Sequence, residues 1–356
     1  MTPELEQHME RVARRSNAFF NAKKPGHFLL WTEVPWEKKE IPPFYKFDLD
    51  HQLHEFIDYQ LENNKILWQA KSGLDDDTIP LMVPWFGISE HSAWTGADVH
   101  FQKDTSLPIP FIKSIDDVEA MNLCTENKWF RRMQQGYDYL RSKKDGSFVL
   151  GVRGTMAPMD IANAIRGDEL FTDFILNPEL VHLLMKKLTS LIPQYYSHML
   201  SWADDLLGGH AYFFHHGWMP GNTIAHLSND AAMLCSPQIF DEFAFEYEKE
   251  LVAPYKHVLY HVHNQKMHFI PRLIEMPQLS LLEISTDPNT VEPLDDLENI
   301  FSLTGSTNLM LHCDSDLLRK RIDELTERNV FLHVWCKDYK DAKEVIAMVR
   351  DKSELL

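Results

Sequence analysis

The sequence predicts an α/β fold, a (β/α)8 or TIM barrel that forms one domain over residues 1–356, with residues 1–24 as an appended helical segment. Eight short apolar runs occur along the chain, and amphipathic helical segments follow most of them. Buried runs of this length that alternate with helices are typical of βαβ units with parallel strands, and eight such units can close into a barrel. The runs are residues 26–34, 79–86, 147–153, 210–215, 257–263, 279–285, 300–305 and 330–336.

Two of the helices between these runs have clear start signals. Asn177 and Ser236 each precede a proline, and a capping residue followed by proline at the first helical position is a common helix start. Leucines recur at helical spacing after Asn177, and aromatic and aliphatic residues do so after Ser236. Further helices are expected over residues 266–276, 315–328 and 339–350, after the fifth, seventh and eighth runs.

A doubly wound open sheet is the competing fold. Such folds often carry a glycine-rich phosphate loop or a nucleophile elbow after a strand. The sequence contains no GxGxxG, GxxxxGK(S/T) or GxSxG motif. The barrel is therefore preferred, although its strands are least well defined before residue 145, where the loops are long.

Charge and cysteine content bound the classes of partner and compartment. The chain has 35 Lys plus Arg against 53 Asp plus Glu, a formal net charge of −18. An acidic surface repels nucleic-acid phosphates and anionic lipid, which argues against both as partners, and ordinary solubility also explains the charge. The four cysteines form no CxxC pair, which is typical of a reducing cytosol rather than a disulfide framework or zinc ribbon.

Two further features of the chain bear on its location and loops. The N-terminus lacks the apolar stretch of a signal peptide, and no run is long enough to span a bilayer. We therefore expect a cytoplasmic protein. The short acidic run at residues 75–77 is expected in a solvated loop.

Potential metal ligands stand near the ends of three predicted strands. His261 and His263 end the fifth run and share a face, because strand side chains alternate. Glu283 lies near the end of the sixth run, and Cys336 ends the eighth. In a barrel the C-terminal ends of the strands meet at the rim that carries the active site, and imidazole, carboxylate and thiolate all bind zinc. We therefore predict zinc at these four residues. Alternatively, Cys336 is a small apolar side chain and Glu283 pairs with a basic residue.

An ordered series of short segments carries a family resemblance. The segments are IPFIKSIDDVE at 109–119, GTMAPMDIANAIRG at 154–167, NPELVH at 177–182, SND at 228–230 with SPQIFDEF at 236–243, the turn at 261–264, GSTN at 305–308, and Cys336 followed by KEVIAM at 343–348. In this order they resemble the uroporphyrinogen decarboxylase superfamily. That superfamily includes decarboxylases and zinc methyltransferases that move methyl groups from corrinoid proteins to thiols such as coenzyme M.

The resemblance implies roles for the same ligands. In the methyltransferase branch, and in the similar catalytic half of cobalamin-independent methionine synthase, an HxC pair and a distant cysteine hold zinc. A glutamate joins them in the latter. His261, Glu283 and Cys336 match this pattern, and Cys336 would also serve catalysis. His263 stands where the family has cysteine, so the site loses one thiolate. A less anionic zinc acidifies a bound thiol more but leaves its sulfur less electron-rich, and it can also activate water.

A second cluster follows the fourth run and should face the same rim. It consists of His215, Trp218, Met219, His226 and Asp230. Trp218 and Met219 would form an apolar wall, so His215 and Trp218 are expected to contact substrate. Asp230 stands where the family carries a substrate-facing acid, which implies a catalytic role. It could equally cap a short helix. Asp160, in a family-like segment, is a further candidate for substrate binding.

The resemblance therefore implies a zinc-dependent methyltransferase of one-carbon metabolism. Its methyl group would come from a corrinoid protein partner, and its acceptor would be a thiol or a related small molecule. A uroporphyrinogen decarboxylase-like lyase is the second hypothesis. That chemistry needs arginines for several substrate carboxylates, and the RQAGR motif of those enzymes is absent where this chain reads WTEVPWE at 31–37. A non-catalytic corrinoid- or small-molecule-binding barrel is the third hypothesis.

Overall fold

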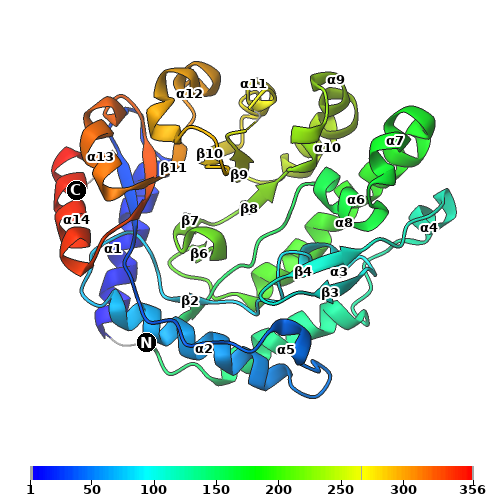
Figure 1. The fold of residues 1–356 in the computed structure, drawn as a ribbon, viewed down its shortest axis with the longest axis horizontal. Coiled ribbons are helices and arrows are strands. Elements are labelled where there is room, and N and C mark those ends of the chain that lie inside the picture. The colour runs from blue at the N-terminus through cyan, green and yellow to red at the C-terminus, as the bar shows by residue number, and fades with distance from the viewer. Residues whose placement is uncertain (1–2, 266, 355–356) are drawn as a thin grey trace.

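Six parallel strands form the main sheet in the computed structural model of the chain, which describes residues 3–265 and 267–354 (Figure 1). Their order across the sheet is β1-β12-β11-β10-β9-β8. The strands are β1 (Phe28–Glu33), β8 (Thr223–Ser228), β9 (His257–His263), β10 (Leu279–Ser285), β11 (Leu309–Asp314) and β12 (Val330–Trp335).

The remaining strands are short. β2 (Leu81–Met82) and β5 (Val149–Leu150) form a separate parallel pair, and two antiparallel hairpins complete the set. A few backbone hydrogen bonds join the segments around the β2–β5 pair to the main sheet, from Asp77 N to Leu30 O, from Thr155 N to Ala225 O and from Ala157 N to Ser228 O. A continuous eight-stranded ladder is not formed within the described residues. The hairpins are β3 (Asp98–Phe101) with β4 (Ser106–Ile109), and β6 (Gly209–Ala211) with β7 (Trp218–Pro220).

Helices surround the strands (Figure 1). Amphipathic helices cover a sheet in this way because each buries one apolar stripe. No helix among the described residues is both long enough and apolar enough to cross a membrane. The helices are α1 (Pro3–Phe20), α2 (Leu53–Ala70), α3 (Glu90–Ala93), α4 (Ile115–Ala120), α5 (Lys128–Ser142), α6 (Pro158–Arg166), α7 (Glu169–Leu176), α8 (Pro178–Trp202), α9 (Pro237–Phe240), α10 (Glu246–Val252), α11 (Ile270–Leu273), α12 (Leu297–Thr304), α13 (Ser315–Arg321) and α14 (Tyr339–Lys352).

Most of the expected strands are found, with one error and several omissions. Seven of the eight apolar runs contain strands, but residues 300–305 lie in and just after α12. Leu297, Ile300 and Thr304 are buried at helical spacing, and Gly305 follows with a positive φ of 55°. β8 and β11 of the main sheet were not expected, and neither were the short strands β3, β4 and β7. Of the predicted segments, residues 1, 2, 266, 355 and 356 lie outside the described residues.

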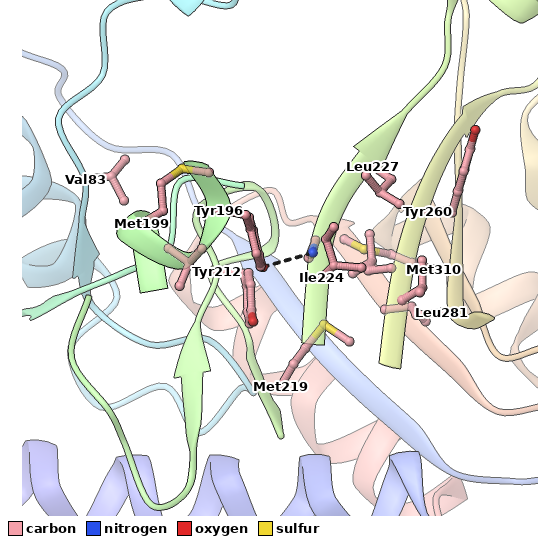
Figure 2. Packing of buried hydrophobic residues seen from close by; sticks show 14 of the residues in the cluster. Val83, Tyr196, Met199, Tyr212, Met219, Ile224, Leu227, Tyr260, Leu281 and Met310 are labelled. Atoms are coloured by element: carbon pink, nitrogen blue, oxygen red, sulfur yellow. Dashed lines mark hydrogen bonds between the residues drawn. The ribbon is translucent and has the colours of Figure 1, made fainter. Parts of the chain in front are cut away.

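Buried side chains from α8, β7 and the main sheet meet in the interior (Figure 2). The Tyr196 hydroxyl accepts a hydrogen bond from Ala225 N at 3.1 Å and donates one to Thr223 O at 3.0 Å. These bonds tie α8 to β8 beneath the polar end of that strand. Met310 and Leu281 extend the apolar layer toward the other strands (Figure 2).

The acidic run at residues 75–77 is not a solvated loop. Asp76 and Asp77 are buried, each 1% exposed. Asp77 accepts hydrogen bonds from Leu30 N at 2.8 Å and from Arg15 Nε at 2.5 Å. Asp76 accepts from Thr32 N and its hydroxyl at 2.9 and 2.7 Å. The two carboxylates therefore satisfy the free edge of β1 and bind α1 to it.

Candidate metal centre

Strand register gathers histidines on the inner side of the sheet. His261 on β9 pairs in register with Glu283 on β10, and His312 on β11 pairs with His333 on β12. Residues paired in register across parallel strands face the same side. Met310 and Phe331 lie two residues before His312 and His333 on the same face of these strands, are in register with each other and are buried. The polar cluster therefore rests on an apolar floor.

His261 and His263 point their Nε2 atoms at one another. These two atoms are 3.2 Å apart. Behind them, His261 Nδ1 lies 3.0 Å from a Glu283 oxygen and His263 Nδ1 lies 2.9 Å from an Asp287 oxygen. Neither ring N–H points straight at its oxygen, so each contact is electrostatic more than a linear hydrogen bond. The anionic oxygens favour the proton on each Nδ1, and Glu283 raises the pKa of His261 despite its burial, so the facing Nε2 atoms either share a proton or, when both are unprotonated, offer two lone pairs to a cation.

Such a pair needs a cation or a shared proton between its lone pairs. Two nitrogens bound to one tetrahedral zinc at 2.0–2.1 Å would be about 3.3 Å apart, close to the observed spacing. Asp230 supplies a third donor, because its Oδ1 is 3.6 Å from His263 Nε2. Donor atoms of Asp230, His261 and His263 all lie within 4.8 Å of one another. The residues present thus fit a transition-metal ion with two imidazoles and one carboxylate.

Glu283 is the buried anion at the centre of the cluster. One of its oxygens lies 2.8 Å from His312 Nε2, and the other lies 2.9 Å from His226 Nε2. Burial alone would raise the pKa of Glu283, but the adjacent His261 charge and the imidazole donors hold that pKa well below its usual range. Glu283 is therefore a carboxylate that fixes the orientation of three imidazoles.

The flanking histidines are neutral. Burial lowers the pKa of His215 to about 3 and that of His333 to about 4, and it also lowers the pKa of His226. His333 stacks on Trp31, with ring centroids 3.6 Å apart. Neutral imidazoles keep one nitrogen lone pair each, which is the form that binds metals.

Asp160 lies behind Asp230 and shapes the turn that carries it. Its carboxyl oxygens accept hydrogen bonds from the backbone nitrogens of Asp230 and Ala231 at 3.0 and 2.8 Å. Burial, and then the Asp230 charge, raise the pKa of Asp160 to about 8. The Asp230 side chain is about half exposed and makes no capping hydrogen bond to the following turn. Asp230 therefore faces the site rather than capping the turn.

Trp218 lies apart from the histidines. Its indole nitrogen donates to the Leu206 carbonyl at 2.7 Å, and its ring fills the space where Gly209 has no side chain. Met219 belongs to the buried apolar interior (Figure 2). Both residues are almost fully buried, so neither presents the apolar wall to a ligand that the sequence suggested. His215, by contrast, lies beside His226 and Glu283.

Cys336 is not gathered with the other expected ligands. Its sulfur lies 3.7 Å from the Val334 carbonyl, and it is absent from both donor groups found among the described residues. Burial, and then Asp341, raise the pKa of this thiol to about 12. His333 and Trp335 share one face of β12, with rings 4.7 Å apart, and alternation directs the next residue elsewhere.

Sequence reasoning missed His312 and His333 and gave His226 no ligand role. Each lies within an apolar strand, in TIAHLS, LMLHCD and VFLHVW. An isolated histidine in such a run was the available signal. β11 was not expected, so His312 had no assigned position, whereas His333 lay in the predicted run 330–336 without being given a role. A cavity of about 600 Å3 lies elsewhere, at α1 and α2, and does not include the cluster.

Comparison with known proteins informs the fold. No protein-family model and no curated protein sequence matches the chain. A methyltransferase from Methanosarcina mazei superposes with a TM-score of 0.60 and 12% identity, covering 96% of this chain and 98% of that one. The YdhT protein from Bacillus subtilis aligns at a TM-score of 0.32 and 10% identity over 99% of this chain and 90% of that one, too low to inform the fold. The chain thus has a fold similar to that of a methyltransferase along nearly its whole length.

Proposed function

We propose that this chain is a zinc-dependent methyltransferase with a (β/α)8-type fold that moves a methyl group from a corrinoid protein to a thiol acceptor. The observation that carries the proposal is the His261–His263 pair. Its facing Nε2 atoms are 3.2 Å apart, and a carboxylate lies behind each ring. The similarity of fold to a methyltransferase and the ordered segments shared with the uroporphyrinogen decarboxylase superfamily support the reaction class.

The zinc ligands in this proposal are His261, His263 and Asp230. Glu283 and Asp287 would orient the two imidazoles from behind, as carboxylates commonly do for zinc-bound histidine. This assignment replaces Cys336 with Asp230 and moves Glu283 behind His261. Three protein ligands leave one position for substrate, which is the arrangement of catalytic zinc sites.

Zinc in such a site would bind a substrate thiol as its thiolate, the nucleophilic form that accepts a methyl group. Because Asp230 is the only anionic ligand, the site would be strongly electrophilic. Asp160 would support Asp230 from behind, because its oxygens accept hydrogen bonds from the backbone nitrogens of Asp230 and Ala231. His263 and Asp230 are the more exposed members of the cluster, so substrates would approach from their side.

Metal analysis followed by a methyl-transfer assay tests this proposal. The zinc-loaded chain is mixed with methylcobalamin, as a stand-in for the methylated corrinoid protein, and with coenzyme M. We expect loss of methylcobalamin absorbance and formation of the methyl thioether. The His263→Gln variant should lose this activity by at least about 100-fold, beyond the range seen for outer partners of a metal site. His257→Gln, on the same strand but facing Ser280, is the matched control.

Three results would contradict the proposal. The first is a chain that binds no zinc, and the second is a zinc-loaded chain inactive with coenzyme M and other thiols. The third is turnover of uroporphyrinogen at rates above about 1 s⁻¹, which would favour the decarboxylase. Zinc binding without any turnover would favour a non-catalytic barrel.

A further inference from the structure

A second group of metal donors lies next to the His261–His263 pair. His215, His226 and Glu283 are all buried, and their donor atoms lie within 4.8 Å of one another. His226 Nε2 and Glu283 Oε2 are 2.9 Å apart. That spacing is short enough for both atoms to bind one ion. None of these three residues is a zinc ligand in the function proposed above.

His215 provides an independent sign of a missing partner. Its side chain is 1% exposed, and its Nε2 atom has no hydrogen-bond partner among the described residues. Buried polar atoms are nearly always satisfied, so an orphan nitrogen in a cluster of other donors requires an explanation. A metal ion bound at Nε2 supplies that partner.

The other two donors are held in place by their surroundings. Phe214 stacks on His226 with ring centroids 4.6 Å apart, and Gly154 packs against the His226 backbone so closely that a Cβ at Gly154 would lie 2.8 Å from the His226 amide nitrogen. His312 holds the second oxygen of Glu283 at 2.8 Å. The donors therefore need little rearrangement to bind an ion.

The local charge tolerates a second dication. Glu283, Asp230 and Asp287 contribute three carboxylates around the histidines. Arg153 is the positive group nearby, and Glu90 pairs with it at 2.9 Å. Two divalent ions would thus be largely balanced by the carboxylates already present.

We propose that His215, His226 and Glu283 bind a second divalent first-row transition metal beside the zinc of the His261–His263 site. Glu283 would then have two functions. It would bind the buried ion, and it would also contact His261 Nδ1 at 3.0 Å, so the two ions would be coupled through one carboxylate. Imidazole and carboxylate donors suit zinc and its neighbours in the first row. This proposal goes beyond the methyltransferase assignment and does not require that reaction.

Metal counting on the full chain tests the second site. The purified protein is stripped with a chelator, reloaded with Zn²⁺ or Co²⁺, freed of excess metal and measured by mass spectrometry. We expect two ions per chain for the wild type, one for His215→Gln, one for His263→Gln and none for the double variant. His257→Gln should keep two ions. Cobalt spectra should show two separable sets of visible bands, each lost in one single variant.

One ion per wild-type chain, or two ions retained by His215→Gln, would overturn the proposal. If His215→Gln does not fold, a cobalt titration of the wild type decides: two saturable steps support the second site and a single step refutes it. The two proposals fail separately. Two ions without methyl transfer would contradict only the proposed function, whereas methyl transfer with one ion would contradict only the second site.

Discussion

The buried carboxylates at the edge of β1 and the buried histidines inside the sheet differ in whether their polar atoms have hydrogen-bond partners. At the edge, every carboxylate oxygen of Asp76 and Asp77 accepts at least one hydrogen bond from a lysine, an arginine, a threonine or a backbone nitrogen. Inside the sheet, Glu283 is similarly surrounded, but His215 Nε2 has no partner within residues 3–265 and 267–354, and the Nε2 atoms of His261 and His263 face each other. The carboxylates of the first region thus have all their partners among the described residues, although Nε and Nη1 of the neighbouring Arg350 lack one. In the second region the unpartnered atoms are imidazole nitrogens, which can bind a metal ion as a guanidinium cannot, and this is the physical reason for proposing metal there.

Disrupting the Asp76–Asp77 cluster should have the largest effect on the free energy of unfolding. Asp77→Ala removes a fully buried carboxylate and leaves Arg15 inside the protein without its closest partner. Unpairing a buried charge costs about 3–5 kcal/mol. We expect that loss in the free energy of unfolding measured by urea denaturation, with metal content unchanged. Asp75→Ala, at a half-exposed carboxylate of the same run, should cost less than about 1 kcal/mol. Metal loss in folded Asp77→Ala would show that the clusters are coupled.

The Glu283→Gln variant tests the histidine cluster inside the sheet. The amide keeps the size of the side chain but removes the charge that orients His261 and His226. Metal affinity should fall about 10- to 100-fold, the usual result of losing an outer carboxylate, and further at any site that Glu283 itself ligates. Competition with a chelating dye measures the affinity. Glu275→Gln, on the surface, is the control. Unchanged affinity in Glu283→Gln would place the metal away from this carboxylate.

Features of the two clusters that are set within one strand could be predicted from the sequence. Features that depend on contacts between distant segments could not. The shared face of His261 and His263 follows from strand alternation, and sequence was sufficient to find the pair. The burial of Asp77 depends on Arg15, which lies 62 residues earlier in helix α1. The contribution of His312 depends on register between β10 and β11, and β11 itself was not expected. Alternation along a strand can be predicted from residue types, whereas contacts between distant segments cannot.

Glu248 offers a pH test that separates burial from metal binding. Burial raises the pKa of this carboxyl to about 7, although Tyr260 and Asn229 donate hydrogen bonds to it. Its proton is released at lower pH in the unfolded chain than in the folded one. Its contribution to stability is therefore complete below about pH 4.5 and is lost as the pH rises to about 7.

Glu248→Gln should therefore stabilise the protein by about 3 kcal/mol at pH 8 and have little effect at pH 4.5. Urea denaturation at the two pH values measures this difference. Glu246→Gln, at an exposed position of the same helix, should show no such pH dependence. Equal effects of Glu248→Gln at both pH values would mean that the carboxyl titrates normally in the folded protein.

Cys336→Ala should have the smallest effect, and it separates two assignments of the metal site. As a zinc ligand, Cys336 would be a thiolate, and its loss would abolish or strongly weaken binding. In the structure its sulfur lies near the Val334 carbonyl, and its raised pKa keeps the thiol protonated. The residue then acts as a small apolar side chain, whose truncation costs about 1 kcal/mol. We expect full metal content with a slightly lower melting temperature. Loss of the zinc while the variant stays folded would restore Cys336 as a ligand and require the end of β12 to turn toward His261.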